Sequence, residues 1–530
     1  MNQTTTQQRI TKSSFSLSSI KKQLPTLLAG FLLPMGFAPF HLPGLAILGI
    51  ALFFFILQGK TTKQAFTTGF TFGLGCLGLG VSWVYVSIHE YGHLNSIVSA
   101  MVTLLFIVYL AIYTSLMAGL YAYLSQRRSI IFSILLFSSL WAITEYLRSI
   151  VMGGFPWLLL GYGQIDTPLK HLLPILGVYG VSFFACIAGC CLTAAFMTRG
   201  VHRFSSLIAF VFILVAPSAL QWLSWTSSTS ESITVGVIQA NKSMRDKWDE
   251  SLFWELLNGY AESATTLVKQ NKLVVMPESA IPIPTHFIND YLDQLNQAAI
   301  ESGSSILLGT MTPSVDDDNK LHNAMIALGE AQGVYQKQHL VPFGEYIPKP
   351  FKLLIDWMAI PISDLNPGET NQPLVFIQSH PIASLICYEL AYPELLRRQL
   401  PLAEWIVSIS DDGWFGHSFA MYQQLQMAQA MSLLTGRYQV VANNDGLSSI
   451  INAQGEIIQS IPAYEEGVLE SRISPIQGST PWVFWGDYPI LIMSIIVIGL
   501  AYALKIKKIN NHCLHPIAAS NKRRYSYQPI

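Results

Sequence analysis

Three polar side chains stand at or near the ends of apolar runs in the second half of the chain. Glu278 closes the run "KLVVMP", Lys337 follows "GVYQ", and Cys387 follows "ASLI". Strand ends are where α/β sheets gather ligand-binding and catalytic groups. A thiol with a pKa of about 8.5 needs a base or positive neighbours to react quickly. A buried glutamate can be that base and an ammonium can stabilise an oxyanion, so these three residues are the parts that acyl transfer requires.

Each of these residues also has an ordinary structural interpretation. A lone buried cysteine is usually a small hydrophobe, and a glutamate or lysine at a strand end is usually a solvated turn or loop residue. A Cys–His pairing is a second catalytic alternative, although no papain-like signature surrounds Cys387. The histidines available for it are His286, His322, His339, His380 and His417. No spacing typical of a metal site and no phosphate-binding glycine loop occurs, so we expect no metal and no cofactor.

The composition predicts that much of the chain faces lipid. Of the 530 residues, 51% are hydrophobic and only 12% are charged, against about 25% charged in soluble domains. A helical span needs about 20 apolar residues, and we expect about eight spans in a polytopic α-helical membrane protein. The apolar stretches lie near residues 24–40, 43–58, 66–88, 96–123, 129–150, 170–198, 205–223 and 487–504. The near-zero net charge argues against nucleic acid as a partner.

Basic residues lie in alternate loops, and this pattern predicts the orientation. The loop 89–95 has no lysine or arginine, although Lys170 lies in or near the other outward loop. The positive-inside rule therefore puts both termini in the cytoplasm and residues 225–485 outside. The basic loop residues are Lys21, Lys22, Lys60, Lys63, Arg127, Arg128, Arg199, Arg203, Lys505, Lys507 and Lys508. The polar N-terminal segment is expected to be a retained tail. Trp482, Trp485 and Tyr488 precede the last apolar stretch, as an aromatic belt would.

The orientation divides the chain into segments. We expect a cytoplasmic tail (1–23), a membrane domain of seven spans (24–224), an extracytoplasmic catalytic domain (225–485), an eighth span (486–505) and a second cytoplasmic tail (506–530). Cys387 is the one cysteine in the outer segment, where an unpaired thiol risks oxidation. That placement favours a chemical role for it.

Short apolar runs alternate with amphipathic segments in the outer part, which predicts an α/β domain. Strands are expected at 233–241, 272–279, 304–312 and 323–329, and later at "LVFIQ", "PIASLICY", "EWIVSISD", "YQVVANN" and "SSIINAQGEIIQ". Helices are expected over 249–270 and 288–301.

Several motifs resemble those of a known family. "MPESAIP", "YQKQHLVPFGEYIP" and "LICYE" together resemble the Glu–Lys–Cys signature of the nitrilase superfamily. Within it the chain is similar to the apolipoprotein N-acyltransferase family, in segments that include "GFAPF" (36–40), "GFPWLLLGYGQ" (154–164), "KWD" (247–249) and "TPWVFWGDYP" (480–489). The resemblance implies a nitrilase-like αββα sandwich inserted before the last span, and a ping-pong acyltransferase reaction.

The resemblance also implies roles and substrates. Glu278 would be the general base, Lys337 the oxyanion stabiliser and Cys387 the nucleophile that carries the acyl group as a thioester. Glu345, Tyr388 and Glu389 would support them, and Trp248 would lie near the substrate entrance, unless it only packs at a helix start. The donor would be a membrane phospholipid, typically phosphatidylethanolamine. The acceptor would be the free α-amino group of the diacylglyceryl-cysteine of apolipoproteins, and the location the bacterial inner membrane with the catalytic domain on the periplasmic side.

The chain departs from this family at some positions. Asp411 replaces a common asparagine, and Met431 and Leu434 stand where an arginine and a glutamate are common, which bears on acceptor handling or local packing. The segment 351–362 is either a lipid-dipping gate or an ordinary amphipathic helix. Two other functions remain alternatives: a membrane-tethered nitrilase-type amide hydrolase in which water replaces the amine, and a non-catalytic binder of lipid or lipoprotein.

Overall fold

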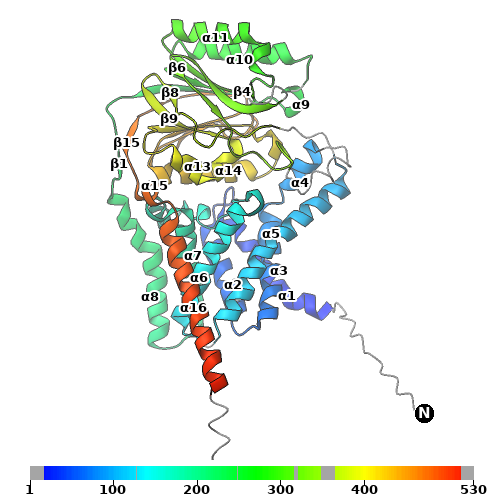
Figure 1. The fold of residues 1–530 in the computed structure, drawn as a ribbon, viewed down its shortest axis with the longest axis vertical. Coiled ribbons are helices and arrows are strands. Elements are labelled where there is room, and N and C mark those ends of the chain that lie inside the picture. The colour runs from blue at the N-terminus through cyan, green and yellow to red at the C-terminus, as the bar shows by residue number, and fades with distance from the viewer. Residues whose placement is uncertain are drawn as a thin grey trace, which may run out of the picture.

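The structure has two parts, a bundle of long helices and an α/β domain that lies against one end of it (Figure 1). It is a computed structural model that describes residues 17–92, 94–126, 128–247, 249–314, 320–347 and 365–514. Trp248 and the segment 351–362 lie outside the described residues, so the expectations for them stay predictions.

Eight helices of the described chain form the bundle. They are α1 (Leu17–Leu32), α2 (Pro43–Leu57), α3 (Thr62–Gly80), α5 (Ser96–Leu124), α6 (Ile130–Ile150), α7 (Leu173–Met197), α8 (Val201–Val215) and α16 (Tyr488–Leu514). Each expected apolar stretch therefore contains a helix. In the first stretch the helix contains Pro25 and ends at Leu32, and a short 3₁₀ turn follows from Pro34.

The described residues contain five helices long and apolar enough to cross a membrane. A sixth candidate is α3 together with Val84–Tyr91, which is bent from it by 64°. The five are Ser96–Leu124, Ile130–Gly153, Pro168–Met197, Val201–Trp222 and Tyr488–Lys507. The chain is thus a polytopic helical protein, and the number of eight spans stays a prediction.

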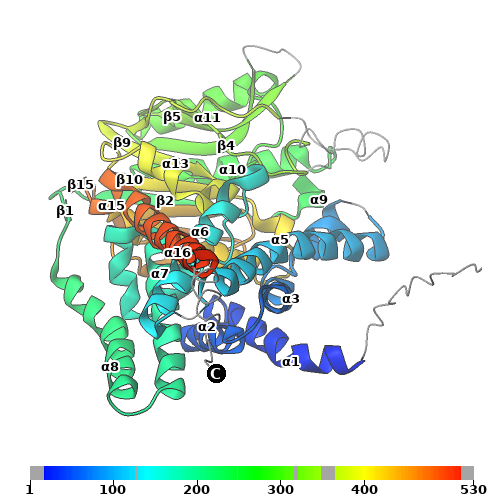
Figure 2. The ribbon, with the colours of Figure 1, turned by 60° about the horizontal axis from the view of Figure 1, so that its bottom comes forward.

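The outermost helix, α8, presents apolar side chains on its surface. It lies at the edge of the bundle in both views (Figures 1 and 2), and none of its side chains is fully buried. Its exposed large apolar residues include Phe204, Ile208, Val211, Phe212 and Val215. Such a surface is costly in water and favourable in lipid, so it is the surface expected of a membrane-spanning helix.

Small residues let the helices of the bundle approach closely. A Cβ atom on Gly69 of α3 would lie 2.4 Å from the Thr114 carbonyl oxygen of α5. On Gly75 it would lie 2.3 Å from the Leu27 carbonyl oxygen of α1. Glycine at these positions is therefore required by backbone-to-backbone packing, as is common in membrane bundles.

The α/β domain is built on two sheets. One sheet has the strand order β14-β2-β3-β4-β5-β7, with parallel pairing of β2, β3 and β4. The other has the order β13-β12-β11-β10-β9-β8-β6, with parallel pairing of β9, β10 and β11. The strands are β2 (Ile233–Gln239), β3 (Leu273–Val275), β4 (Ser305–Pro313), β5 (Leu321–Gly329), β6 (Ala331–Gln332), β7 (Val334–Gln336), β8 (Val375–Ile377), β9 (His380–Ile386), β10 (Trp405–Ser410), β11 (Gln439–Asn443), β12 (Ser449–Ile451), β13 (Ile457–Ser460) and β14 (Gly467–Ile473).

The sheets pack face to face with helices on both outer faces. Buried residues of both sheets, such as Val237, Leu307 and Val407, form one core. Helices α10 (Phe253–Leu267) and α11 (Asn289–Glu301) cover the six-stranded sheet, and α13 (Pro393–Arg398) and α14 (Ala420–Thr435) lie on the side facing the bundle (Figure 1). The αββα sandwich and its expected strands and helices are confirmed.

The helices α13 and α14 share a hydrophobic core with the bundle that they face. Trp157, from the loop after α6, packs against Phe415, with ring centroids 5.9 Å apart, and Met431 and Leu434 of α14 are fully buried in the same cluster. At the end of the domain Trp482 is also buried, whereas Trp485 and Tyr488 are exposed. The expectation that Trp482 belongs to an interfacial belt was wrong, because its ring packs inside and its Nε1 donates to Asp487.

Candidate active site

Glu278, Lys337 and Cys387 come together between the two sheets. Glu278 lies two residues beyond Met276, which continues β3, and Lys337 directly follows β7. Cys387 directly follows β9 and begins a 3₁₀ turn, η9 (Cys387–Ala391). The first two strands belong to one sheet and the third to the other, so the stacking of the sheets is what assembles the site.

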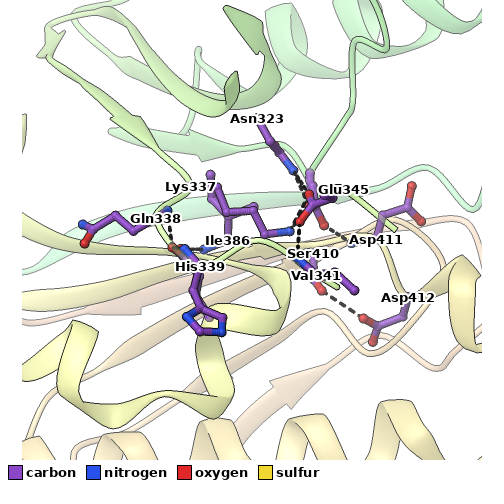
Figure 3. A network of polar contacts seen from close by, with 12 residues as sticks. Asn323, Lys337, Gln338, His339, Val341, Glu345, Ile386, Ser410, Asp411 and Asp412 are labelled. Atoms are coloured by element: carbon purple, nitrogen blue, oxygen red, sulfur yellow. Dashed lines mark hydrogen bonds and ion pairs between the residues drawn. The ribbon is translucent and has the colours of Figure 1, made fainter. Parts of the chain in front are cut away.

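A buried ring of polar groups surrounds the Lys337 ammonium (Figure 3). Its Nζ donates to Glu278 Oε1 at 3.1 Å and to Glu345 Oε1 at 2.9 Å. The amide of Asn323 donates to the same two oxygens, at 2.7 and 3.0 Å. Lys337 is 1% exposed and Glu278 is 4% exposed. Two carboxylates this close in a buried site repel each other, and the ammonium between them offsets that repulsion.

The second oxygen of each carboxylate is bound by backbone. Glu278 Oε2 accepts from the backbone N–H of Asp411 at 3.0 Å, and Glu345 Oε2 accepts from that of Val341 at 2.8 Å. Both carboxylates therefore have a fixed orientation. Glu345, a sequence-predicted supporting residue, contacts Lys337 directly and can hold its ammonium in place.

Cys387 has a strained backbone, as do Ser279 directly after Glu278 and Phe343 in the loop before Glu345. The φ of Cys387 is +53°, in the left-handed region that residues with a side chain rarely adopt. Strain of this kind is found at functional sites, where the surrounding structure holds the residue in one position. Here the strained residue ends a buried parallel strand and carries the thiol into the site.

The charges around Cys387 and Lys337 set their protonation. Burial, and after it the Glu278 charge, raises the pKa of the Cys387 thiol well above its usual value, while Lys337 lowers it. For Lys337, burial lowers the pKa, but the charges of Glu278 and Glu345 outweigh burial and raise it well above the usual value. The resting thiol is therefore protonated and the amine is an ammonium, so the site needs a base to take the thiol proton and already holds a donor.

Glu389 organises the backbone on both sides of the site. Its Oε1 accepts from the N–H groups of Gln338 and His339, at 2.6 and 3.0 Å. Its Oε2 accepts from the Ile386 N–H at 2.8 Å and from the Tyr335 hydroxyl at 3.1 Å. Burial raises the Glu389 pKa to about 7, although the backbone donors lower it. One side chain thus fixes the segment after Lys337 and the residue before Cys387.

Tyr388 joins the nucleophile turn to the bundle. Its hydroxyl donates to the Gly154 carbonyl oxygen at 3.3 Å, in the loop after α6. The Tyr392 hydroxyl donates to the same oxygen at 3.2 Å. Gly154 has a φ of +79°, and a Cβ atom there would lie 2.0 Å from the Ser149 carbonyl oxygen. The conformation of the loop at residue 154 therefore requires glycine. The turn that bears Cys387 is thereby held against the membrane part of the chain.

Two residues of this site were missed by the sequence analysis. Asn323 shares its amide between Glu278 and Glu345, and its one sequence signal is a polar residue at the start of an apolar strand. Lys247 is buried and pairs with Asp411, with Nζ and Oδ2 2.6 Å apart. Lys247 is the first residue of the "KWD" motif, in which the sequence analysis gave a role only to Trp248.

The histidine alternative is not supported by the contacts around the thiol. The His339 ring packs at a tilt against the Tyr392 ring, with ring centroids 3.7 Å apart, and His322 Nδ1 lies 2.9 Å from the Asn366 carbonyl oxygen. Besides burial, the groups that shift the pKa of the Cys387 thiol are Glu278, Lys337, Asp412 and Ser410. Among the described residues no three His, Cys, Asp or Glu side chains are arranged to hold a metal ion.

Comparison with known proteins gives matches over nearly the whole chain. One family model, described as the apolipoprotein N-acyltransferase N-terminal domain, matches residues 29–191, and another, described as carbon-nitrogen hydrolase, matches residues 234–477. An apolipoprotein N-acyltransferase from Coxiella burnetii is 35% identical over 480 residues, which are 90% of this chain and 99% of that protein. One from Methylococcus capsulatus is 34% identical over 497 residues, covering 93% of this chain and 98% of that protein.

A solved structure of a carbon-nitrogen hydrolase from Helicobacter pylori is also similar, with 16% identity. The match covers 46% of this chain and 89% of that chain, at a TM-score of 0.37.

Proposed function

This chain belongs to the apolipoprotein N-acyltransferase family, and from that premise we propose how its own residues transfer an acyl chain to the N-terminus of lipoproteins. The observation that carries the proposal is the buried contact of Glu278 and Lys337 beside the strained Cys387. It supplies a base, an oxyanion donor and a nucleophile at one place.

In the first half-reaction the Glu278 carboxylate takes the proton of the Cys387 thiol. The thiolate attacks the ester carbonyl carbon of a phospholipid, and Lys337 Nζ donates to the oxyanion that forms. The oxyanion collapses, the C–O bond to the lysophospholipid breaks, and Glu278 returns the proton to the leaving oxygen. The enzyme then carries the acyl chain as a thioester.

In the second half-reaction the free α-amino group of a diacylglyceryl-cysteine attacks the thioester. Glu278 takes a proton from the nitrogen, Lys337 again stabilises the oxyanion, and the C–S bond breaks to release the Cys387 thiolate and the amide product. The thiolate then recovers its proton from Glu278, which completes the cycle.

The other predicted residues have supporting roles. Glu345 holds the Lys337 ammonium, Glu389 fixes the backbone on both sides of the site, and Tyr388 fixes the nucleophile turn to the loop after α6. Trp248, which follows Lys247 in sequence, is assigned to the substrate entrance from the family resemblance.

We place the enzyme in the bacterial inner membrane with the α/β domain (residues 225–485) on the periplasmic side, and phosphatidylethanolamine as the donor. The alternation of basic loops supports this orientation. Both substrates are lipids, and extracting an acyl chain into water costs about 0.8 kcal/mol per CH₂ group. A catalytic domain held against the membrane by its own helices avoids that cost.

The test is acyl loading without acceptor. Purified protein given phosphatidylethanolamine should accumulate about one acyl chain per molecule on Cys387, released by neutral hydroxylamine. Cys387→Ala should carry none, and Glu278→Gln should fail to load because the thiol keeps its proton.

The acceptor separates a transferase from a hydrolase. A diacylglyceryl-peptide with a free amine should discharge the loaded enzyme, and the same peptide with a blocked amine should not. Free fatty acid as the main product in the presence of abundant acceptor would contradict the transferase proposal, as would an acyl group on another residue.

A further inference from the structure

A second buried ion pair lies next to Glu278, the proposed catalytic base. Lys247, the last residue of α9 (Met244–Lys247), is 2% exposed, and Asp411, which follows β10, is 3% exposed. Lys247 Nζ and Asp411 Oδ2 are 2.6 Å apart. This pair contributes no atom to the Lys337 ring, and the two-step reaction above does not use it.

Both members of the pair also bind Glu278. Lys247 Nζ donates to the Glu278 backbone carbonyl oxygen at 3.3 Å, and the Asp411 backbone N–H donates to Glu278 Oε2 at 3.0 Å. The same glutamate is therefore held at its main chain by one partner and at its carboxylate by the other. A change in either partner would be transmitted to the base.

Asp411 is itself held in one orientation. Its Oδ1 accepts from the Asn444 amide at 3.2 Å and from the Gly413 N–H at 3.3 Å, while Oδ2 faces Lys247. Nearby Asp412 and Asp445 are poorer counter-ions, because burial, aided by the neighbouring carboxylates, raises their pKa values to about 7 and about 8. Asp411 is thus the carboxylate that neutralises Lys247.

We infer that Lys247 and Asp411 form a positioning pair that holds the Glu278 carboxylate toward the Cys387 thiol and keeps the charge behind the base neutral. The inference rests on the proposed role of Glu278 as the base. Its basis is geometric: a matched cation and anion, both buried, each bound to the same residue. Removing one partner leaves an uncompensated charge beside the base, whereas removing both leaves none.

The two single substitutions should therefore act on the base in opposite directions. Asp411→Asn leaves the Lys247 cation unpaired, which favours ionised Glu278. The acid limb of the pH profile, which is the fall of the loading rate as pH decreases, should therefore move to lower pH. Lys247→Met leaves the Asp411 anion unpaired, which disfavours ionised Glu278, so the acid limb should move to higher pH.

The pH profile must be interpreted with every charged group around the base in view. The groups that face Glu278 and the pair include Lys337 after β7, Glu345 from the following loop, Cys387 of η9, Asp412 after β10, Asp445 after β11, Tyr260 of α10 and Tyr91 at the end of the segment Val84–Tyr91. None of them is substituted, but the Asp411 charge raises the pKa values of Asp412 and Asp445, and the Lys247 charge lowers that of Asp445. In each single variant these carboxyl groups should therefore shift in the same direction as Glu278, and in the double variant the shifts should cancel.

The experiment measures the pH dependence of acyl loading on Cys387 with phosphatidylethanolamine in detergent micelles. Lys247→Met should load at least tenfold more slowly than wild type at pH 7, and the acid limbs of the two single variants should shift in opposite directions. The double variant Lys247→Met with Asp411→Asn should recover most of the rate and the wild-type limb. Lys242→Met is the matched control, because the Lys242 ion pair with Glu466 is at the surface and long, at 3.8 Å.

The outcomes distinguish the inference from the function on which it rests. Opposite shifts that cancel in the double variant support the pair. Normal loading by wild type, with an acid limb that stays in place in both single variants, overturns the pair and leaves the proposed function intact. If the double variant loads no faster than the slower of the two single variants, the positioning pair is also overturned. Removing both charges would then have failed to restore the loading rate, and this holds even if the double variant folds poorly. Failure of wild type to load overturns the proposed function itself.

Discussion

Lys337 offers a test that separates charge from position. In Lys337→Arg the site keeps a positive charge, but the guanidinium is broader and planar, and it must enter a buried space in which an ammonium touches carboxylates at 2.9 and 3.1 Å. In Lys337→Met the charge is gone, and Glu278 and Glu345 share only the Asn323 amide. We expect both variants to load Cys387 much more slowly than wild type, and the methionine variant also to lose stability.

The magnitudes follow from the burial of the ring. Losing one oxyanion donor costs about a hundredfold or more in rate, and this loss applies to both variants. Removing one partner of a buried pair costs about 3–5 kcal/mol of stability, and this loss applies in full only to the methionine variant. For a domain of this size that corresponds to a fall of roughly 10 °C in the unfolding temperature, and the arginine variant should lose clearly less.

The assay pairs two measurements on the same detergent-purified samples. Acyl loading of Cys387 is followed by intact mass over time, and thermal unfolding is followed by tryptophan fluorescence. Loading by the arginine variant at near the wild-type rate would show that charge alone suffices and that Lys337 has no positional role. Equal losses of unfolding temperature in the two variants would show that the ring is not held together by charge.

Further predictions concern the residue that holds the backbone of the site, the pH dependence of stability, and the side of the membrane on which the α/β domain lies. Glu389→Gln should slow loading more than tenfold, because the glutamine NH₂ group would face backbone N–H groups that now donate to the carboxylate. The control is Glu394→Gln at an exposed position, and equal activity of the two variants would contradict this role of Glu389. Asp412 has a pKa raised by burial from 3.8 to about 7, so its contribution to stability should fall as pH rises from about 4 through 7. Asp412→Asn should therefore raise the unfolding temperature relative to wild type more at pH 8 than at pH 5, and a pH-independent difference would refute this. A cysteine at the exposed Gln454 should react with a membrane-impermeant maleimide on intact cells, whereas one at Lys63 should react only after permeabilisation; the reverse pattern would invert the orientation.

Much of the α/β domain could be predicted from the sequence because its central strands are buried on both faces. Such strands appear as continuous apolar runs, so β2, β9 and β10 stand out between amphipathic helices. Glu278 follows the short buried strand β3 and Cys387 follows β9, which is why both could be singled out from the sequence.

The rest of the site depends on contacts between distant residues. Asn323 meets Glu278 across 45 positions of sequence and Lys247 meets Asp411 across 164, and no local pattern encodes such pairings. The positive φ of Cys387 is likewise imposed by the fold, since the sequence around it contains no glycine. Trp482 was misjudged for the same reason: proximity to an apolar stretch does not tell which way a ring faces.

The departures at α14 have a simple physical account. Met431 and Leu434 are fully buried where the α/β domain packs against the bundle. Apolar side chains suit this surface, because a charged group there would need a buried partner. We therefore expect these two positions to affect the packing between the domain and the bundle and to leave the chemistry at Cys387 unchanged.

The short strands β1 (Thr226–Ser228) and β15 (Ile476–Gly478) join the two ends of the α/β domain, with Thr226 opposite Gly478. During synthesis α1 to α8 are made first, the domain next and α16 last. Because α16 packs against α6, the bundle lacks one of its helices until the whole domain has left the ribosome. Pairing of β15 with β1 then brings the start of α16 back to the point where the chain left α8, so the order of biosynthesis makes assembly of the membrane part depend on the domain inserted within it.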